Sequence, residues 1–598
     1  MIKLLKNLFT LLTRDQQKRF YLLQVFVVLM AVIEIFGVAS IVPFISLVTN
    51  IDQLEEESFV GQIYKLSGLS SHEQFILLTG VGVLILLFIS TIISIFTIWK
   101  LSMFASKIGT DIADRLYTHY LRQGWLFHAS GSSAQLTKKI STECLRVSGG
   151  ILIPLMYLNA KIVLAILMSL SIFIYDPQVA VIAISIFAFA YFVIFRIVRK
   201  HLGYYGAVIS NVNEKRFRLM NEGFGGIKDV LLLGTDNDFI NRFNLSGNSL
   251  AHSMGRSQAL VQAPRYLMEL IAFGSMISLI LYLIFSLDSN LSKVLPILSV
   301  YAIGAIKLLP AVQQIYSSLA IIKANIAAFE SIKEDLDNSL HIEPSLDNTS
   351  KDCIYPIDKI SLENISFTYP NKTEPAVENI NMLIPVNSVI GIVGPSGSGK
   401  STIIDILLGL IDSNHGQLKV DDQIINNNNR RSWQNAIGFV AQSIFLSEGT
   451  ISENVAFGVP TNQIDLNQVK EVLKLAHLSE YVETLSDGIH TKVGERGVQL
   501  SGGQRQRIGI ARALYNKAEV LVFDEATSSL DGVTEKMIMD AIHDFSGKKT
   551  IILIAHRLKT VQKCDQIFYI SEGKVNDNGT YEELLKRNEH FKKMAIHS

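Results

Sequence analysis

The sequence is poor in the residues that would mark several common classes of protein. Its 598 residues include only three cysteines (Cys144, Cys353 and Cys564), which are far apart and form neither a disulfide framework nor a zinc-binding spacing. Only 18% of the residues are charged, whereas soluble chains average about 25%. The 54 basic residues are balanced by 54 acidic ones, so no net charge points to a nucleic-acid partner.

The shortage of charge lies in the first half of the chain, which contains long apolar runs. Each run is near the roughly 20 residues that a helix needs to cross a bilayer. The first run is too long for a cleavable signal peptide, and no small-residue cleavage site ends it. We therefore predict six membrane spans, at residues 21–49, 75–98, 151–175, 178–198, 266–286 and 292–314.

Lysine and arginine are distributed unevenly among the stretches that connect these spans. The stretches 100–150 and 196–265 and the N-terminus are rich in both, whereas the stretch 50–74 has one lysine, Lys65, among several acidic residues. Basic connections stay on the cytoplasmic side of a membrane. We therefore expect both termini to be cytoplasmic, with six crossings between them.

The two long basic connections also have a helical pattern. Apolar residues recur at helical intervals in the first of them, as at Ile108, Ile112 and Leu116. We expect the spans to continue as helices into the cytoplasm, to turn near residues 125–128 and 221–234, and to return. Ordinary solvated helix ends are the alternative interpretation.

The composition changes near residue 334. Residues 334–356 are polar, as a linker is, and short β-type runs then alternate with helical runs, as in an α/β domain. The predicted fold is therefore multidomain. An all-α, six-helix transmembrane domain at residues 1–333 is followed by a linker at 334–356 and an α/β domain at 357–598.

A glycine-rich loop in the second half fits the phosphate-binding pattern G-x-x-x-x-G-K-[ST]. It lies between a predicted strand at 388–394 and a predicted amphipathic helix at 399–410. Backbone N–H groups of such a loop cradle phosphate oxygens, the lysine reaches the β- and γ-phosphates, and the hydroxyl ligates Mg²⁺. The loop residues are Gly394, Pro395, Ser396, Gly397, Ser398, Gly399, Lys400 and Ser401.

A second apolar strand, predicted at 520–525, ends in two carboxylates. Asp524 fits the Mg²⁺-holding position of P-loop ATPases. Glu525 points to the other side of the strand end and could activate the attacking water. Another apolar strand, at 550–556, ends at His556, which taken alone is more typical of a structural histidine.

The second half resembles the ATPase domain of ABC transporters. The motifs GPSGSGKST, VAQS, LSGGQRQR, VLVFDE, SSLD and IAHRL stand in that family's order. The resemblance implies that Thr402 joins the ATP- and Mg²⁺-binding residues, that Gln442 senses Mg²⁺ and the lytic water, and that Glu525 is the general base. It also implies that His556 contacts the γ-phosphate and that Tyr369 stacks on adenine.

The LSGGQ stretch is a second phosphate-binding device in the same domain. It opens the predicted helix 503–515, whose positive end attracts an anion, and the resemblance implies contact with ATP held by a facing domain. Because the chain has one ATPase domain and one set of spans, we predict a head-to-tail homodimer with two shared ATP molecules; a heterodimer is the alternative. The signature residues are Leu500, Ser501, Gly502, Gly503 and Gln504.

The patterns that indicate the transported substrate are less specific than the ATPase motifs. The order of membrane domain and then ATPase resembles exporters, and no peptidase-like extension precedes the first span. Four stretches, at 32–48, 222–234, 262–274 and 304–315, resemble bacterial lipid-linked oligosaccharide flippases. This implies an inner-membrane flippase for lipid-linked oligosaccharides that works by alternating access. A general lipid, lipid A or multidrug exporter is the alternative, and a gated ABC channel is a third interpretation.

Ionisable side chains inside the predicted spans favour an anionic amphipathic substrate. A charge in lipid is costly and normally faces a cavity or a partner. We assign Glu34, Lys161, Arg265 and Lys307 to a candidate substrate cavity, in which the three cations suit a diphosphate. Mutual pairing, or side chains that extend to the membrane surface, is the alternative.

Overall fold

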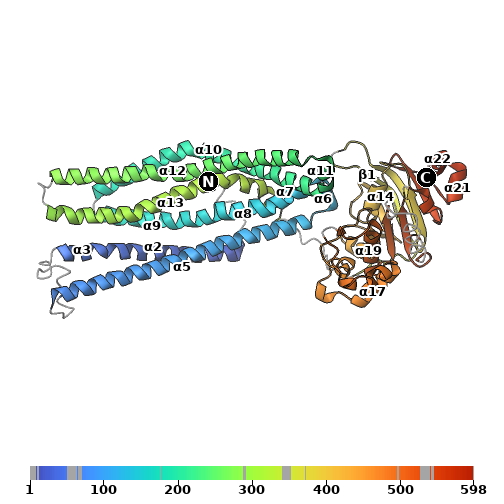
Figure 1. The fold of residues 1–598 in the computed structure, drawn as a ribbon, viewed down its shortest axis with the longest axis horizontal. Helices are drawn as coiled ribbons and strands as arrows, with labels where there is room; N and C mark the ends of the chain where they lie inside the picture. The colour runs from blue at the N-terminus through green and yellow to red at the C-terminus, as the bar shows by residue number, and fades with distance from the viewer. Residues whose placement is uncertain are drawn as a thin grey trace. The chain divides into compact units, whose positions relative to one another are not determined.

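The fold is seen in a computed structural model of the chain (Figure 1). The structure describes residues 9, 13–49, 64, 71–175, 177–286, 291–339, 352–370, 372–494, 497–525, 539, 545–555 and 557–596. The chain divides into two compact units. The first contains residues 1–123 and 127–342, and the second contains residues 124–126 and 343–598.

The first unit is all-helical, as predicted. Long helices that lie side by side dominate it (Figure 1), and two π-helical turns, at 139–143 and 148–152, interrupt the helical run that starts at Ser133. The helices are α2 (Arg14–Ala39), α3 (Ile41–Thr49), α5 (His72–Leu121), α6 (Trp125–Ser130), α7 (Ser133–Lys138), α8 (Cys144–Val147), α9 (Ile153–Tyr175), α10 (Pro177–Gly225), α11 (Ile227–Leu233), α12 (Asp236–Ser286) and α13 (Leu291–Asn338).

The first predicted span, 21–49, is two helices rather than one. Helix α2 ends at Ala39, and α3 begins at Ile41. Pro43 has no N–H to donate to the carbonyl of Ala39 four residues earlier, so the helical hydrogen-bond ladder is interrupted there. The hydroxyl of Ser40 donates to the carbonyl of Gly37 and caps the end of α2.

The basic connections are helical, which confirms that part of the prediction. Helix α5 continues into the first connection as far as Leu121, and α10 and α12 form most of the second. The short helices α6 and α11 stand at the two predicted turning points. Helix α11 ends at Gly234, whose φ of 64° favours glycine.

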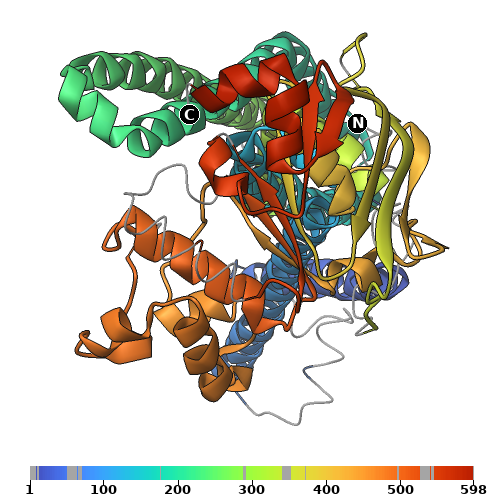
Figure 2. The same ribbon diagram turned by 90° about the vertical axis from the view of Figure 1, so that its right-hand side faces the viewer.

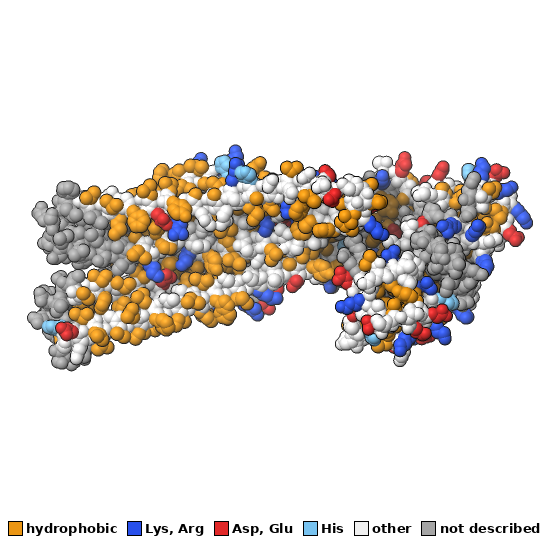
Figure 3. Space-filling view, viewed as in Figure 1, with side chains coloured by type: hydrophobic (Ala, Val, Ile, Leu, Met, Phe, Trp, Pro, Cys, Tyr) orange, Lys and Arg blue, Asp and Glu red, His pale blue; other side chains and the backbone are white. Residues whose placement is uncertain are grey.

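Within the described residues, four helical segments are long and apolar enough to cross a membrane: Arg14–Ile45, His72–Leu121, Ser133–Ile174 and Gly304–Asn338. Hydrophobic side chains cover much of the visible face of this unit (Figure 3). The predicted spans 178–198 and 266–286 lie in α10 and α12, where some side chains are outside the described residues. These two spans, the part of the span 292–314 that precedes Gly304, and the total of six stay predictions.

Helix α13 continues into the predicted linker. Its buried apolar residues Phe329, Ile332 and Leu336 continue at helical spacing, so the helix extends as far as Asn338. The first residues of the segment 334–356 are therefore helical, and residues 340–351 lie outside the described residues.

The second unit contains two β-sheets. An antiparallel sheet has the strand order β2-β1-β4-β5, and a six-stranded sheet has the order β10-β9-β3-β8-β7-β6. All neighbouring strands of the larger sheet are parallel except β10 and β9. The strands are β1 (Lys359–Phe367), β2 (Val377–Pro385), β3 (Val389–Val393), β4 (His415–Val420), β5 (Gln423–Ile424), β6 (Ile437–Val440), β7 (Val520–Asp524), β8 (Thr550–Ile554), β9 (Gln566–Ser571) and β10 (Lys574–Gly579).

Helices of the second unit pack on both faces of the larger sheet. The C-terminal helices, red in Figure 2, lie beside the last strands, and α21 contacts β10. The helices are α14 (Lys400–Leu407), α15 (Arg430–Gln434), α16 (Ile451–Val455), α17 (Leu466–Leu475), α18 (Ser479–Glu483), α19 (Gly502–Tyr515), α21 (Tyr581–Arg587) and α22 (Glu589–Ile596).

The helices α14 and α19 cover opposite faces of the six-stranded sheet. Successive residues of a strand point to opposite faces. In β7, Val520 and Val522 share a buried cluster with Ile403 of α14. Leu521 and Phe523 share the other cluster with Ile508 of α19. The two predicted phosphate-binding helices are thus separated by the sheet.

Candidate ATPase site

One edge of the larger sheet gathers the predicted catalytic residues. Parallel strands end at a common edge, and ligands bind outside their carboxyl ends. The phosphate loop follows β3, Asp524 and Glu525 end β7, and Gln442 follows β6. Strand β8, between β3 and β7, leads to His556, which lies outside the described residues.

The phosphate loop has the backbone that its glycines permit. Gly394, Gly397 and Gly399 have φ values of 157°, 79° and 101°. A Cβ at Gly399 would lie 2.7 Å from the carbonyl oxygen of Ala376, so the loop has no room for a side chain there. The predicted strand–loop–helix is confirmed, with α14 starting at Lys400.

Lys400 is held over its own loop. Its ammonium donates to the carbonyl oxygens of Gly394 and Pro395, each at 2.9 Å. Burial lowers the pKa of Lys400, and the carboxylates of Glu525 and Asp524 oppose this shift. The ammonium is therefore placed between the loop and the two acidic residues, where a phosphate group would need a cation.

Ser398 provides a test of whether the loop fits a phosphate. Its side chain is buried, and its hydroxyl has no hydrogen-bond partner among the described residues. A buried polar group without a partner is costly. A bound phosphate oxygen would satisfy this hydroxyl, so the loop fits the nucleotide that its sequence predicts.

Glu525 and Gln442 meet at the end of the sheet. The amide Nε2 of Gln442 donates to the carboxylate Oε2 of Glu525 at 2.6 Å. Glu525 has a φ of 48°, which is uncommon for a residue with a side chain, and its N–H donates to the carbonyl of Ile554. The carboxylate thus lies beside the Gln442 amide just after the last residue of β7, and its role as the general base stays a prediction.

Two oxygen-bearing side chains suit Mg²⁺. Asp524 pairs with Ile554 at the last position of β7, and Ser401 lies in the first turn of α14. No group of three or more His, Cys, Asp or Glu that could hold a metal occurs in the described ranges. Mg²⁺ is usually bound through one or two carboxylates together with substrate phosphates. Once bound, it would neutralise charge on the phosphates.

Tyr369 lies next to the phosphate helix. Its hydroxyl is 3.2 Å from the hydroxyl of Thr402, and its ring packs edge-on against Phe367 at a centroid distance of 5.0 Å. The side chain is half-buried, and its stacking on adenine stays a prediction.

The signature stretch starts α19 with a capping box. The hydroxyl of Ser501 accepts from the N–H of Gln504 at 3.2 Å, and the side chain of Gln504 accepts from the N–H of Ser501 at 2.8 Å. Gly502 and Gly503 supply the first N–H groups of the helix, which have no intrahelical acceptor. Leu500 is buried and anchors the stretch.

Asp405 was missed by the motif analysis. It lies in α14, where burial raises its pKa to about 6 and the nearby carboxylate of Asp524 adds to the shift. The signal was present in the sequence, because an acidic residue interrupts the apolar run that follows the phosphate loop.

The charges inside the predicted spans form pairs. Lys307 of α13 contacts Glu34 of α2 at 3.1 Å, and Arg265 contacts Glu269 on α12 at 2.8 Å. No ion pair of Lys161 is seen among the described residues. The structure thus contains the mutual pairing that the sequence left open, and its relation to a substrate cavity stays a prediction.

Comparisons with known proteins agree with this architecture. The family model for the ABC transporter transmembrane region matches residues 20–303, and the ABC transporter model matches residues 377–528. The chain belongs to the ABC transporter family, as an exporter-type half-transporter with its membrane region and ATPase fused. It binds ATP and couples ATP hydrolysis to transmembrane transport.

Curated relatives carry the name ATP-dependent lipid A-core flippase. The protein of Escherichia coli K12 is 28% identical over 85% of this chain and 86% of its own length. That of Photorhabdus laumondii is 29% identical over 82% and 83%. That of Cupriavidus pinatubonensis is 40% identical, over 38% of each chain.

A solved structure has the same fold. A bacterial Atm1-family ABC exporter with ATP bound matches 96% of this chain and 98% of its own, with a TM-score of 0.79 and 20% identity.

Proposed function

We propose that two copies of this chain form an ATP-driven flippase that moves an anionic, phosphate-bearing glycolipid across the bacterial inner membrane. The lipid A class is the first candidate, because the curated relatives that match most of the chain carry that name. These names favour a broader lipid exporter over the lipid-linked oligosaccharide flippase that the sequence of the membrane half led us to expect.

The main support for a dimer is the separation of the two phosphate-binding motifs. The loop before α14 and the signature that opens α19 lie on helices that cover opposite faces of one sheet. A single ATP at the loop therefore cannot also meet the signature of its own chain. A second copy, placed head-to-tail, brings each signature to the other copy's nucleotide.

The proposed residue roles follow from the positions of these residues at the carboxyl ends of the parallel strands. Lys400 and the loop N–H groups bind the phosphates, Ser401 and Asp524 hold Mg²⁺, and Glu525 takes the proton of the attacking water. Gln442 touches Glu525 at 2.6 Å and orients it. Loss of the γ-phosphate removes contacts that join the two copies, so hydrolysis lets them separate.

The paired cations favour a lipid substrate with an anionic head group. The side chain of Lys307 is 40% exposed while that of Glu34 is 15% exposed, so the ammonium keeps an open side. Arg265 is more exposed than its partner Glu269 in the same way. Each cation can meet a phosphate without first leaving its carboxylate, and Lys161 adds a further positive charge.

Lipid-linked oligosaccharide is the second candidate. The four stretches of the membrane half that resemble such flippases include the segment around Lys307 and the segment around Arg265. A polyprenyl diphosphate shares the phosphate chemistry of lipid A, so the same cations would serve either lipid.

Proteoliposomes that contain the full chain distinguish these substrates. We expect lipid A-core to stimulate ATP hydrolysis and to be moved in an ATP-dependent way, and Lys307→Met to lose the stimulation. Stimulation by a polyprenyl-diphosphate oligosaccharide alone would select the second candidate. Stimulation only by neutral hydrophobic drugs, unaffected by Lys307→Met, would contradict both.

A further inference from the structure

A group of buried charges joins the α7–α8 segment to α10. Glu143 is fully buried, at 0% exposure, and its carboxylate lies 3.4 Å from the ammonium of Lys138. The same ammonium lies 3.2 Å from Glu214 of α10. Arg146 donates to the other oxygen of Glu143 at 3.0 Å. These four side chains carry two positive and two negative charges.

Uncharged groups complete these contacts. The hydroxyl of Ser210 on α10 donates to Glu143 at 2.7 Å. Arg146 also donates to Asn325 of α13 at 3.2 Å and to the carbonyl of Gly206 on α10 at 3.4 Å. The group therefore ties one short segment to two long helices.

Helix α10 also approaches α13 closely at the same level. A Cβ at Gly206 would lie 2.0 Å from the carbonyl oxygen of Ala324. Further along, α10 and α13 share an apolar cluster that includes Leu202 and Ala320. Among the side chains that the structure describes, the larger apolar cluster of α2, α5, α8, α9 and α13 includes none from α10. Between α8 and α10, ions and hydroxyls take the place of an apolar core.

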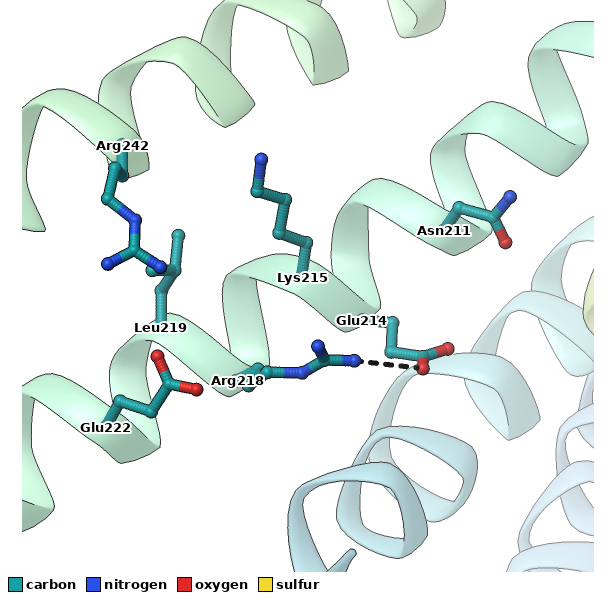
Figure 4. A pocket seen from close by; sticks show the side chains of 7 residues that line it. All are labelled: Asn211, Glu214, Lys215, Arg218, Leu219, Glu222 and Arg242. Carbon is teal, nitrogen blue, oxygen red and sulfur yellow. Dashed lines mark ion pairs between the residues drawn. The ribbon is translucent and has the colours of Figure 1, made fainter.

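A polar contact of this kind suits surfaces that must separate. Exposed apolar surface costs about 25 cal/mol per Å², whereas ions that separate regain their hydration, which offsets much of the attraction that is lost. Water already reaches one end of the group. Glu214 lines a pocket of about 350 Å³ with Lys215 and Arg218, and Arg218 contacts Glu214 at 3.7 Å (Figure 4).

We propose that Lys138, Glu143, Arg146 and Glu214 form a latch, which opens and re-forms between α10 and the α7–α8 segment in each ATP-driven cycle. Closed, the latch fixes α10 against α8 and α13. Open, it frees α10, together with α12 packed along it, to change its angle to the α7–α8 segment. The proposal depends on the transport cycle and not on which lipid is moved.

Hydrogen exchange of the full chain in lipid nanodiscs tests whether the latch opens. Peptides that cover residues 206–214 are compared without nucleotide and with a non-hydrolysable ATP analogue. We expect their exchange to differ by about tenfold between the two states, within the range of coupling between sites in allosteric proteins. Equal exchange in both states would overturn the proposal and show a permanent structural contact.

Two variants test the charges. Glu143→Gln removes the central charge with little change in shape, and we expect it to reduce the difference between the states to less than about twofold, with the KM for ATP unchanged. Glu330→Gln, at an exposed position of α13, is the matched control and should keep the full difference. A full difference in Glu143→Gln would overturn the role of the charges.

Two further variants test the proposal if the Glu143→Gln protein does not fold. Lys138→Met combined with Glu143→Gln leaves Arg146 and Glu214 balanced and should restore part of the difference between the states. Ser210→Ala removes only the 2.7 Å hydrogen bond and should reduce the difference less than Glu143→Gln does. No effect of either variant, in protein that folds, would also overturn the proposal.

Discussion

Replacement of Glu525 by glutamine should stop ATP hydrolysis and leave the fold intact. Glutamine keeps the shape of the side chain and can still accept the 2.6 Å hydrogen bond from Gln442. It cannot take a proton from water. Loss of a general base lowers turnover by about 10²- to 10⁴-fold, which corresponds to about 3–5 kcal/mol in the activation barrier.

The assay is ATP turnover of the full chain in nanodiscs, together with ATP binding. We expect ATP to bind with the parental affinity and to hold the two copies together. Glu519→Gln is a matched control, because Glu519 precedes β7 while Glu525 follows it. Its exposed pair with Lys549 at 3.3 Å contributes less than about 1 kcal/mol. Parental turnover in Glu525→Gln would refute the role of Glu525.

The remaining predictions concern the ATPase unit. Trp433→Phe should lower the free energy of unfolding by about 1–2 kcal/mol, measured in urea, because the fully buried indole loses its 2.8 Å bond to the carbonyl of Leu407. Ser398→Ala should weaken ATP binding about tenfold by titration without lowering the melting temperature of the nucleotide-free protein, since its hydroxyl has no partner among the described residues. The pKa of Asp405 is raised to about 6 by burial, so the folded chain keeps a proton that the unfolded chain releases. Stability should therefore fall as pH rises from about 4 to about 6, and Asp405→Asn should remove this slope in melting scans and gain about 1 kcal/mol at neutral pH after allowance for partial exposure.

Local patterns were enough to predict much of this protein. The strand before Gly394 and the helix after Lys400 follow from glycine spacing and apolar periodicity, which act within a few residues. The long helices of the basic connections followed from the spacing of apolar residues such as Ile108 and Ile112, both of which are buried. The break at Ser40 could have been read from Pro43.

Contacts between distant segments could not be predicted from one sequence. Nothing in the spacing of Glu143, Glu214 and Lys138 reveals that they meet, because the pairing depends on how α10 packs against the π-helical turns. The pair of Glu34 and Lys307 is likewise a product of the helix arrangement. The placement of α14 and α19 on opposite sheet faces required the strand order.

The central claim is that each ATP site is shared between two chains. It is tested by co-expression of two differently tagged inactive variants, Lys400→Ala and Ser501→Arg, and purification of the mixed dimer through both tags. In a head-to-tail dimer, the intact phosphate loop of one copy meets the intact signature of the other. We expect the mixed dimer to recover about half of the parental ATP turnover, since one of two sites is complete. A mixed dimer as inactive as either variant alone would contradict the account.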